Sequence, residues 1–242
     1  MYTNLKSSST GEDLLEDVDQ LIVDMKTKIK YVKKQQLKSI LESVLRVTDV
    51  DVKAEIATEF DTLGIGVDLS AGTKEKNDYT VMVLGGRIGD KIHIIDYRRL
   101  RVMGNLEKLD AMKELMNDWS IIGKQQDGTY FPTYSTCDIW SEAVQYQASL
   151  EADFKRICLN QEGLYNLIWH PVKGFRADKL ARFRGIMGMF EDRKIVFNRY
   201  RNFTAMFEEL TNFGVSSHDD CVDALVWLVN GLSRKGKLQV DY

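Results

Sequence analysis

Acidic side chains gather near the end of the chain, in the stretch "SSHDDCVDALVWLVNGL" over residues 216–232. On a helix Asp219 and Asp223 are i,i+4 neighbours and Asp220 and Asp223 are i,i+3 neighbours, so the three carboxylates share one edge. Two unit charges ~4 Å apart repel by about 4 kcal/mol at an effective dielectric near 20. Asp219 alone is explained as an N-cap, but one cap is all that a helix needs. The following residues are apolar almost all round, which indicates a buried helix whose charges need protons or cations.

Two further acids stand where strands are expected to end. Asp68 closes "LGIGVDLS", and Glu142 follows the apolar run in "CDIWSEAVQYQ". Each has an ordinary explanation, because aspartate forms turns at strand ends and glutamate complements the dipole in the first turn of a helix. Asp138, inside the same expected strand, competes with Glu142 for any role. The glycines that precede Asp68 either allow another backbone to approach the strand closely or have no role beyond interrupting the strand pattern.

Together these acids predict a metal site. An aspartate ending the first strand, a glutamate after the fourth and a carboxylate pair opening the last helix can converge on one edge of a sheet. Mg²⁺ and Mn²⁺ prefer oxygen ligands. Carboxylates that hold two such cations about 4 Å apart are suited to the attack of water on a phosphodiester. His218, next to the cluster, is either a metal ligand or, more simply, a neighbour of the helix cap.

The elements that position these acids follow from hydrophobic periodicity. Strands are expected at 63–70, 78–86, 91–101, 133–140 and 165–173, with 194–198 left open as a short strand. Helices are expected at 105–119, 141–157, 178–190, 203–213 and in the closing segment. Apolar residues on one side of the first of these helices are Leu106, Leu109, Met112, Leu115 and Met116. The turn "RIGD" makes a hairpin of the second and third strands. Three strands followed by alternating strands and helices predict an α/β fold, a mixed five-stranded sheet flanked by helices.

Residues 1–62 differ in character from residues 63–242. Apolar positions over the first 25 residues are spaced for one helical stripe, and the stretch 26–38 carries six lysines and no acid. The sequence therefore predicts a helical linker or extension at 1–62 and a separate α/β domain at 63–242. The extension is either a solvated arm or an arm that touches DNA or a protein partner.

Composition narrows the setting of the protein. The 242 residues are 44% hydrophobic and 29% charged, with a net charge of −3, which is ordinary for a globular protein and gives no overall basic field. Three widely spaced cysteines favour a reducing environment. The sequence has no Cys-x-x-Cys or His-x₃-His pair, which argues against a structural zinc site. We find no signal peptide and no run as long as a membrane span, so an intracellular protein is expected.

Four motifs, in order, resemble the nuclease domain of viral large terminase subunits, as found in tailed bacteriophages. "GIGVDLSAGTKEKNDYTVMVLGG" is similar to the first-strand motif with its G-V-D and downstream D-Y-T. "SEAVQYQASL" is similar to a Glu-x₄-Gln segment. "ADKLARFRGIMGMFEDRKIVF" is similar to a D-K-x-x-R helix followed by a strand, and "HDDCVDAL" to the closing Asp-Asp-x-x-Asp-Ala-Leu motif. The resemblance covers roughly residues 63–232.

The resemblance implies an RNase H-like fold and a two-metal DNA endonuclease that cleaves concatemeric viral DNA during genome packaging. The positions that match metal ligands are Asp68, Glu142 and Asp220, with Asp219 and Asp223 as neighbours that also ligate or tune the site. The implied cofactors are Mg²⁺ or Mn²⁺. The implied partners are double-stranded DNA, a packaging ATPase domain or subunit, the small terminase and the portal protein. The implied location is the cytoplasm of the infected host cell.

The ATPase motor that precedes the nuclease in large terminases has no counterpart here, because no G-x-x-x-x-G-K-[ST] loop occurs in the sequence. We therefore expect an excised nuclease domain or the product of a split gene.

DNA contacts are expected from a locally basic segment. The segment from Lys173 to Arg201 contains nine basic residues and only three acidic ones. A second basic group consists of Arg98, Arg99 and Arg101. Contacts of this kind with phosphates do not depend on sequence. Lys179 and Arg182, in the D-K-x-x-R segment, are the predicted DNA-binding residues.

Other functions stay open at this point. A junction resolvase or transposase of the RNase H-like class shares the acids and differs in substrate. An actin-like nucleotide-binding domain also has an aspartate at the end of its first strand, but it needs a second phosphate loop, which we do not find. A DNA-binding or assembly module that lost its chemistry is the non-enzymatic alternative, and the intact acid set argues against it.

Overall fold

A computed structural model of the chain describes residues 60–69, 79–101, 104–133, 135–142, 145–172, 179–213 and 218–235. One mixed sheet runs through the molecule, with strand order β7-β6-β1-β2-β3-β8. Its strands are β1 (Thr62–Asp68), β2 (Thr80–Ile88), β3 (Lys91–Leu100), β6 (Cys137–Glu142), β7 (Leu167–Val172) and β8 (Ile195–Phe197). Strand β2 is antiparallel to its neighbours, whereas the pairs β1–β6, β6–β7 and β3–β8 are parallel.

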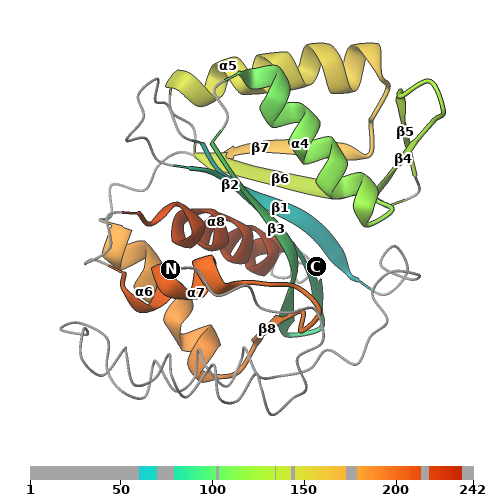
Figure 1. The fold of residues 1–242 in the computed structure, drawn as a ribbon. Helices are drawn as coiled ribbons and strands as arrows, with labels where there is room; N and C mark the ends of the chain where they lie inside the picture. The colour runs from blue at the N-terminus through green and yellow to red at the C-terminus, as the bar shows by residue number, and fades with distance from the viewer. Residues whose placement is uncertain are drawn as a thin grey trace, which may run out of the picture.

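Helices cover both faces of this sheet (Figure 1). They are α4 (Asn105–Asp118), α5 (Gln145–Phe154), its π-helical continuation η1 (Lys155–Gln161), α6 (Lys179–Glu191), α7 (Thr204–Thr211) and α8 (Asp220–Lys235). Figure 1 shows α4 and α5 on one side of the sheet and α6, α7 and α8 on the other. Two clusters of buried hydrophobic residues fill these two layers. The α/β fold with a mixed sheet and flanking helices is therefore confirmed.

The sheet has six strands where five are expected. The additional strand is β8, whose three residues pair with the outer edge of β3, Ile92 opposite Ile195 and Ile94 opposite Phe197. Three residues are too few for an alternating pattern to be distinguished from a loop, so only the pairing with β3 defines this strand. A small hairpin of β4 (Ile122–Lys124) and β5 (Tyr130–Pro132) is also present and was not expected.

The predicted hairpin of β2 and β3 is confirmed, and its turn contains Gly89 with a positive φ of 58°. Helix α4 matches its expected range, but Leu106 is 57% exposed and does not join the buried side of the helix. Helix α5 begins at Gln145, later than expected. Residues 1–59 of the helical extension predicted at 1–62 lie outside the described residues, so the extension and its boundary with residues 63–242 stay predictions.

Helix α8 lies close against β1 because glycines face it. Gly64, Gly66 and Asp68 alternate onto one face of the strand. A Cβ atom on Gly66 would lie 2.1 Å from the carbonyl oxygen of Ala224, and one on Gly64 would lie 2.2 Å from the Trp140 ring. The glycines therefore permit a close backbone approach, and the same face of β1 that receives α8 carries Asp68 at its end.

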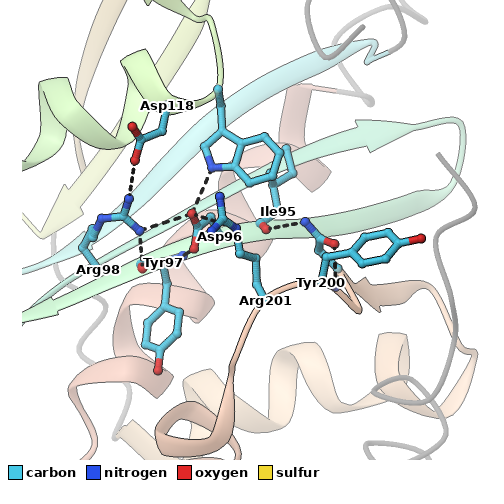
Figure 2. A network of polar contacts seen from close by, with 9 residues as sticks. Ile95, Asp96, Tyr97, Arg98, Asp118, Tyr200 and Arg201 are labelled. Atoms are coloured by element: carbon cyan, nitrogen blue, oxygen red, sulfur yellow. Dashed lines mark hydrogen bonds and ion pairs between the residues drawn. The ribbon is translucent and has the colours of Figure 1, made fainter. Parts of the chain in front are cut away.

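A buried carboxylate ties β3 to its surroundings (Figure 2). Asp96 is 4% exposed and accepts hydrogen bonds from the indole N–H of Trp119 at 3.0 Å and from Arg98 at 3.2 Å. Arg201, from the loop after β8, lies 3.4 Å from the same carboxylate, and Arg98 also pairs with Asp118 at 2.6 Å. Arg98 and Arg201, which the sequence places in basic groups, thus have structural partners.

Candidate active site

Two of the predicted acids end adjacent parallel strands. Asp68 is the last residue of β1 and Glu142 is the last residue of β6, and Val67 at the end of β1 is opposite Ser141. Glu142 thus closes a strand, whereas the sequence places it in the first turn of a helix. Because the carboxyl ends of parallel neighbours meet at one edge about 4.8 Å apart, these two partly exposed carboxylates lie side by side.

The N-terminus of α8 reaches the same edge. Asp220, the first residue of α8, is 4% exposed, and its Oδ2 accepts a hydrogen bond from the backbone N–H of Tyr79 at 3.1 Å. Tyr79 directly precedes β2, where Val81 pairs with Asp68 at the end of β1. The predicted convergence of the ends of β1 and β6 with the mouth of α8 is therefore present in the fold. We refer to Asp68, Glu142, Asp219, Asp220 and Asp223 as the carboxylate site.

Arg182 lies between two of these carboxylates. Its Nη2 donates to Oδ1 of Asp223 at 3.2 Å, and its Nη1 lies 3.8 Å from Oε1 of Glu142. The guanidinium group also lies 5.2 Å from the centroid of the Trp227 ring. The side chains of Arg182 and Asp223 are 9% and 7% exposed, so this positive charge offsets negative charge that is shielded from water. Sequence reasoning assigned Arg182 to DNA, and that contact stays a prediction.

Asp138 lies away from the carboxylate site. It precedes Glu142 by four residues on β6, which is about 13 Å along a strand. Its carboxylate is 1% exposed and lies 2.6 Å from Nε2 of His170, whose ring stacks on Trp140. The two acids face the same side of β6, but only Glu142 stands at the edge with Asp68. This placement favours Glu142 over Asp138 at the carboxylate site.

Asp219 and His218 flank the buried pair. Asp219 is partly exposed, and its backbone carbonyl accepts the N–H of Asp223 at 3.0 Å, as in the first turn of a helix. Nδ1 of His218 lies 3.8 Å from Oδ2 of Asp220, and its ring meets Tyr79 edge-on at 5.4 Å between centroids. Both residues belong to the rim of the carboxylate site, and their roles in ligation stay predictions.

The residues predicted to contact DNA differ in their surroundings. Lys179 is the first residue of α6, which starts near the site because the same helix supplies Arg182, but its side chain lies outside the described residues. In the second basic group, Arg99 pairs with a buried acid, whereas Arg101 is exposed and its guanidinium lies 4.6 Å above the Tyr79 ring.

Sequence reasoning missed Tyr79 and Glu209 and did not separate Arg99 from its basic neighbours. Glu209 in α7 is 4% exposed, accepts the backbone N–H of Cys221 at 2.7 Å and pairs with Arg99 at 3.0 Å. The contact of Tyr79 with Asp220 spans 141 residues and that of Glu209 with Cys221 spans 12. No local pattern signals such contacts, because each joins elements that only the fold brings together.

The donor chemistry of the carboxylate site fits a hard divalent cation. All its candidate ligands are carboxylate oxygens; Asp220 and Asp223 are buried, while Asp68 and Glu142 are open to solvent. Within the described ranges, however, no group of three or more His, Cys, Asp and Glu side chains is gathered to hold an ion. Glu142 and Asp223 are turned to the guanidinium of Arg182 instead.

Comparisons with known proteins find a family model and solved structures to which the chain is similar. The family model described as "Terminase RNaseH-like domain" matches residues 65–232. A terminase nuclease domain of human cytomegalovirus, soaked with Mn, superposes with a TM-score of 0.60 at 14% identity, over 86% of this chain and 99% of that one. The same domain, Mn-soaked with an inhibitor bound, gives 0.59 at 14% identity over 86% and 97%. The large terminase nuclease of the thermophilic phage G20c gives 0.44 at 14% identity over 70% and 81%.

No curated protein matches the chain in sequence. At 14% identity the structural likeness establishes the RNase H-like fold of terminase nucleases but not the activity. The activity has to be argued from the residues of this chain. No helix within the described residues is long and apolar enough to cross a membrane.

Proposed function

The chain belongs to the terminase RNase H-like domain family, and from this premise we propose that it is a metal-dependent endonuclease that cuts concatemeric viral DNA during genome packaging. The observation that carries the proposal is the meeting of Asp68, Glu142 and the mouth of α8 at one edge of the sheet. Family membership favours this function over a junction resolvase, a transposase or an actin-like nucleotide-binding domain.

In the proposed site Asp68, Glu142 and Asp220 hold two Mg²⁺ or Mn²⁺ ions, and Asp219 and Asp223 ligate or tune them. Bound cations of this kind lower the pKa of water and offset the charge that builds on a phosphodiester during hydrolysis. The chain's own part is to hold the carboxylates in place. Asp220 is held by the N–H of Tyr79, and Asp223 is neutralised by Arg182. Asp68 and Glu142 lie at the open side, where a DNA strand can reach them.

We assign double-stranded DNA as the substrate and Lys179 and Arg182 as phosphate contacts. Such contacts position a duplex without reading its sequence. A packaging ATPase domain or subunit, the small terminase and the portal protein are the proposed partners, and the cytoplasm of the infected host cell is the proposed location. Targeting by a motor is consistent with a nuclease of low intrinsic sequence specificity.

Cleavage of supercoiled plasmid tests the proposal. We expect the protein to nick and linearise plasmid with Mn²⁺ or Mg²⁺ and to stop when a chelator is added. Asp68→Asn and Asp220→Asn should each lower the rate at least 100-fold, because each removes a charged oxygen ligand.

Asp90→Asn is the matched control, since Asp90 is exposed in the β2–β3 turn at the opposite end of the strands. We expect its rate to equal that of the parent. Equal cutting by the parent and both site variants contradicts the site assignment, and a parent that cuts equally well in chelator contradicts metal dependence.

A further inference from the structure

The first turn of α8 is anchored by an acid from another helix. Glu209 lies in α7, is 4% exposed, and its Oε2 accepts the backbone N–H of Cys221 at 2.7 Å. Cys221 directly follows Asp220, so this hydrogen bond holds the peptide next to the carboxylate. The N–H groups of a first helical turn have no partner within the helix. Glu209 therefore satisfies one of them from outside α8.

Arg99 on β3 secures Glu209 in turn. Its Nη2 lies 3.0 Å from Oε1 of Glu209, on the oxygen that does not bind Cys221. Burial is the largest single influence and works against the charged guanidinium, but the charge of Glu209, its hydrogen bond with Arg99 and the charges of other neighbouring groups together outweigh burial and hold the pKa of Arg99 above its ordinary value. Burial and then the charge of Glu209 raise the pKa of the Cys221 thiol. A charge-assisted contact of this kind holds the Glu209 carboxylate in the orientation that receives the Cys221 N–H.

The guanidinium of Arg99 also contacts Tyr79, the residue whose backbone N–H binds the Asp220 carboxylate. Arg99 stacks on the Tyr79 ring at 3.4 Å from its centroid, and the backbone N–H of Tyr79 donates to Oδ2 of Asp220 at 3.1 Å. The contacts form a closed ring that runs from Asp220 through Tyr79, Arg99, Glu209 and Cys221 back to Asp220. This ring joins β3, α7, α8 and the residue before β2.

We propose that Arg99 and Glu209 are positioning residues that fix the Asp220 carboxylate for metal binding. The inference rests on the proposed function only in naming a divalent cation as the ligand of Asp220. Glu209 holds the peptide that follows Asp220, and Arg99 holds both Glu209 and Tyr79. Neither residue touches substrate or metal in this role. The flat, delocalised guanidinium is needed, since it pairs with a carboxylate and stacks on a ring at once, which an ammonium group does poorly.

Two variants separate the parts of the ring. Glu209→Gln keeps the shape and an acceptor for the Cys221 N–H but removes the charge that Arg99 binds. Arg99→Lys keeps the charge but loses the stack on Tyr79. Loss of a group that orients a metal ligand commonly weakens metal binding 10- to 100-fold. We expect each variant to raise the Mn²⁺ dissociation constant about tenfold, measured on the full chain by electron paramagnetic resonance of free Mn²⁺.

Asp96→Asn is the matched control. Asp96 is as buried as Glu209 and also pairs with arginines, but its partners belong to β3, the end of α4 and the loop after β8 (Figure 2). We expect this variant to lower the melting temperature as much as Glu209→Gln and to leave Mn²⁺ affinity within twofold of the parent. Equal loss of Mn²⁺ affinity in Asp96→Asn and Glu209→Gln overturns the proposal, since the effect then follows stability alone. Unchanged affinity in both ring variants overturns it as well.

Amide hydrogen exchange in chelator tests the anchor without metal. We expect Glu209→Ala to speed exchange at the start of α8 at least tenfold while the end of the helix stays protected. Unchanged exchange there overturns the anchoring role. Mn²⁺ binding by Asp220→Asn distinguishes the two proposals: if it matches the parent, the ligand assignment of the proposed function fails, and hydrogen exchange alone then decides on the anchor.

Discussion

At the scale of single residues, the carboxylate site combines buried and exposed acids. Asp220 and Asp223 are 4% and 5% exposed, and each has a donor within hydrogen-bond distance. A buried carboxylate without a partner would be costly to keep ionised. Arg182 supplies such a partner to Asp223 in the first turn of an apolar helix.

Replacement of Arg182 tests this charge balance. We expect Arg182→Gln to lower the free energy of unfolding by about 3 kcal/mol in chelator, because removal of one partner leaves a buried charge uncompensated. Urea denaturation measures the change. Mn²⁺ should restore part of the loss, since a cation then supplies the missing charge.

Arg156→Gln is the control for this variant. Arg156 pairs with Asp153 at 2.8 Å, but its side chain is 58% exposed, so its loss should cost less than about 1 kcal/mol. An equal loss in the free energy of unfolding for the two substitutions would mean that the ion pairs of Arg182 stabilise the protein no more than an exposed ion pair does.

At the scale of elements, the contact of α8 with β1 sets the distance between Asp68 and Asp220. The backbone of α8 packs directly on Gly66. Because glycine has no side chain, nothing on β1 holds the helix further away at this position. The apolar residues of α8, among them Trp227 at 1% exposure, bury the helix against the sheet. The element that carries two of the acids is therefore also the most deeply packed helix of its layer.

Gly66→Ala should separate α8 from β1. The new Cβ would lie 2.1 Å from the carbonyl oxygen of Ala224, and backbone cannot yield as a side chain does. We expect a loss of about 3 kcal/mol in the free energy of unfolding, at the upper end for overpacked cores, with a larger loss of cleavage than of stability. Urea denaturation and plasmid cleavage at a temperature where the variant is folded measure both.

Gly188→Ala is the matched control, because Gly188 lies in α6 with no atom within 4 Å of a new Cβ. Alanine favours the helix by up to about 1 kcal/mol, so we expect a neutral or stabilising effect. A Gly66→Ala protein as stable and active as Gly188→Ala would contradict the close packing of α8 on β1.

At the scale of the whole molecule, the carboxylate site joins both ends of the described chain. β1 begins at residue 62 and α8 ends at residue 235, yet Asp68 and Asp220 meet at one edge. A ligand that binds these residues binds only the folded chain, since the unfolded chain separates them. Metal binding is therefore coupled to the stability of the entire domain.

Thermal unfolding measures this coupling. At a Mn²⁺ concentration 100 times the dissociation constant, one site adds about 2.7 kcal/mol of stability. For a chain of this size we expect the melting temperature to rise by about 5–10 °C and to return to its starting value in excess chelator. Asp220→Asn should lose most of the rise and Asp90→Asn should keep it. A full rise in Asp220→Asn would place the stabilising ion elsewhere.

Local patterns in the sequence were sufficient to predict much of this protein. The α/β class, the β2–β3 hairpin and α8 follow from periodicity, which acts over a few neighbouring residues. The same periodicity placed Asp68 and Glu142 at or near strand ends and grouped Asp219, Asp220 and Asp223 in one helical turn. The meeting of these acids at one edge was predicted because the ends of parallel strands and the mouths of helices gather there.

Only the tertiary structure decided how these pieces combine. The register of β1 against β6 separated Glu142 from Asp138, and pairing with β3 made a strand of Ile195–Phe197. Arg182 reached Asp223 across 41 residues, and Glu209 reached the start of α8 from another helix. Such contacts depend on how whole elements pack and on which side chain fills each gap between them. The sequence thus determined which residues could do chemistry, whereas the packing of α7, α8 and β3 decided what holds them in place.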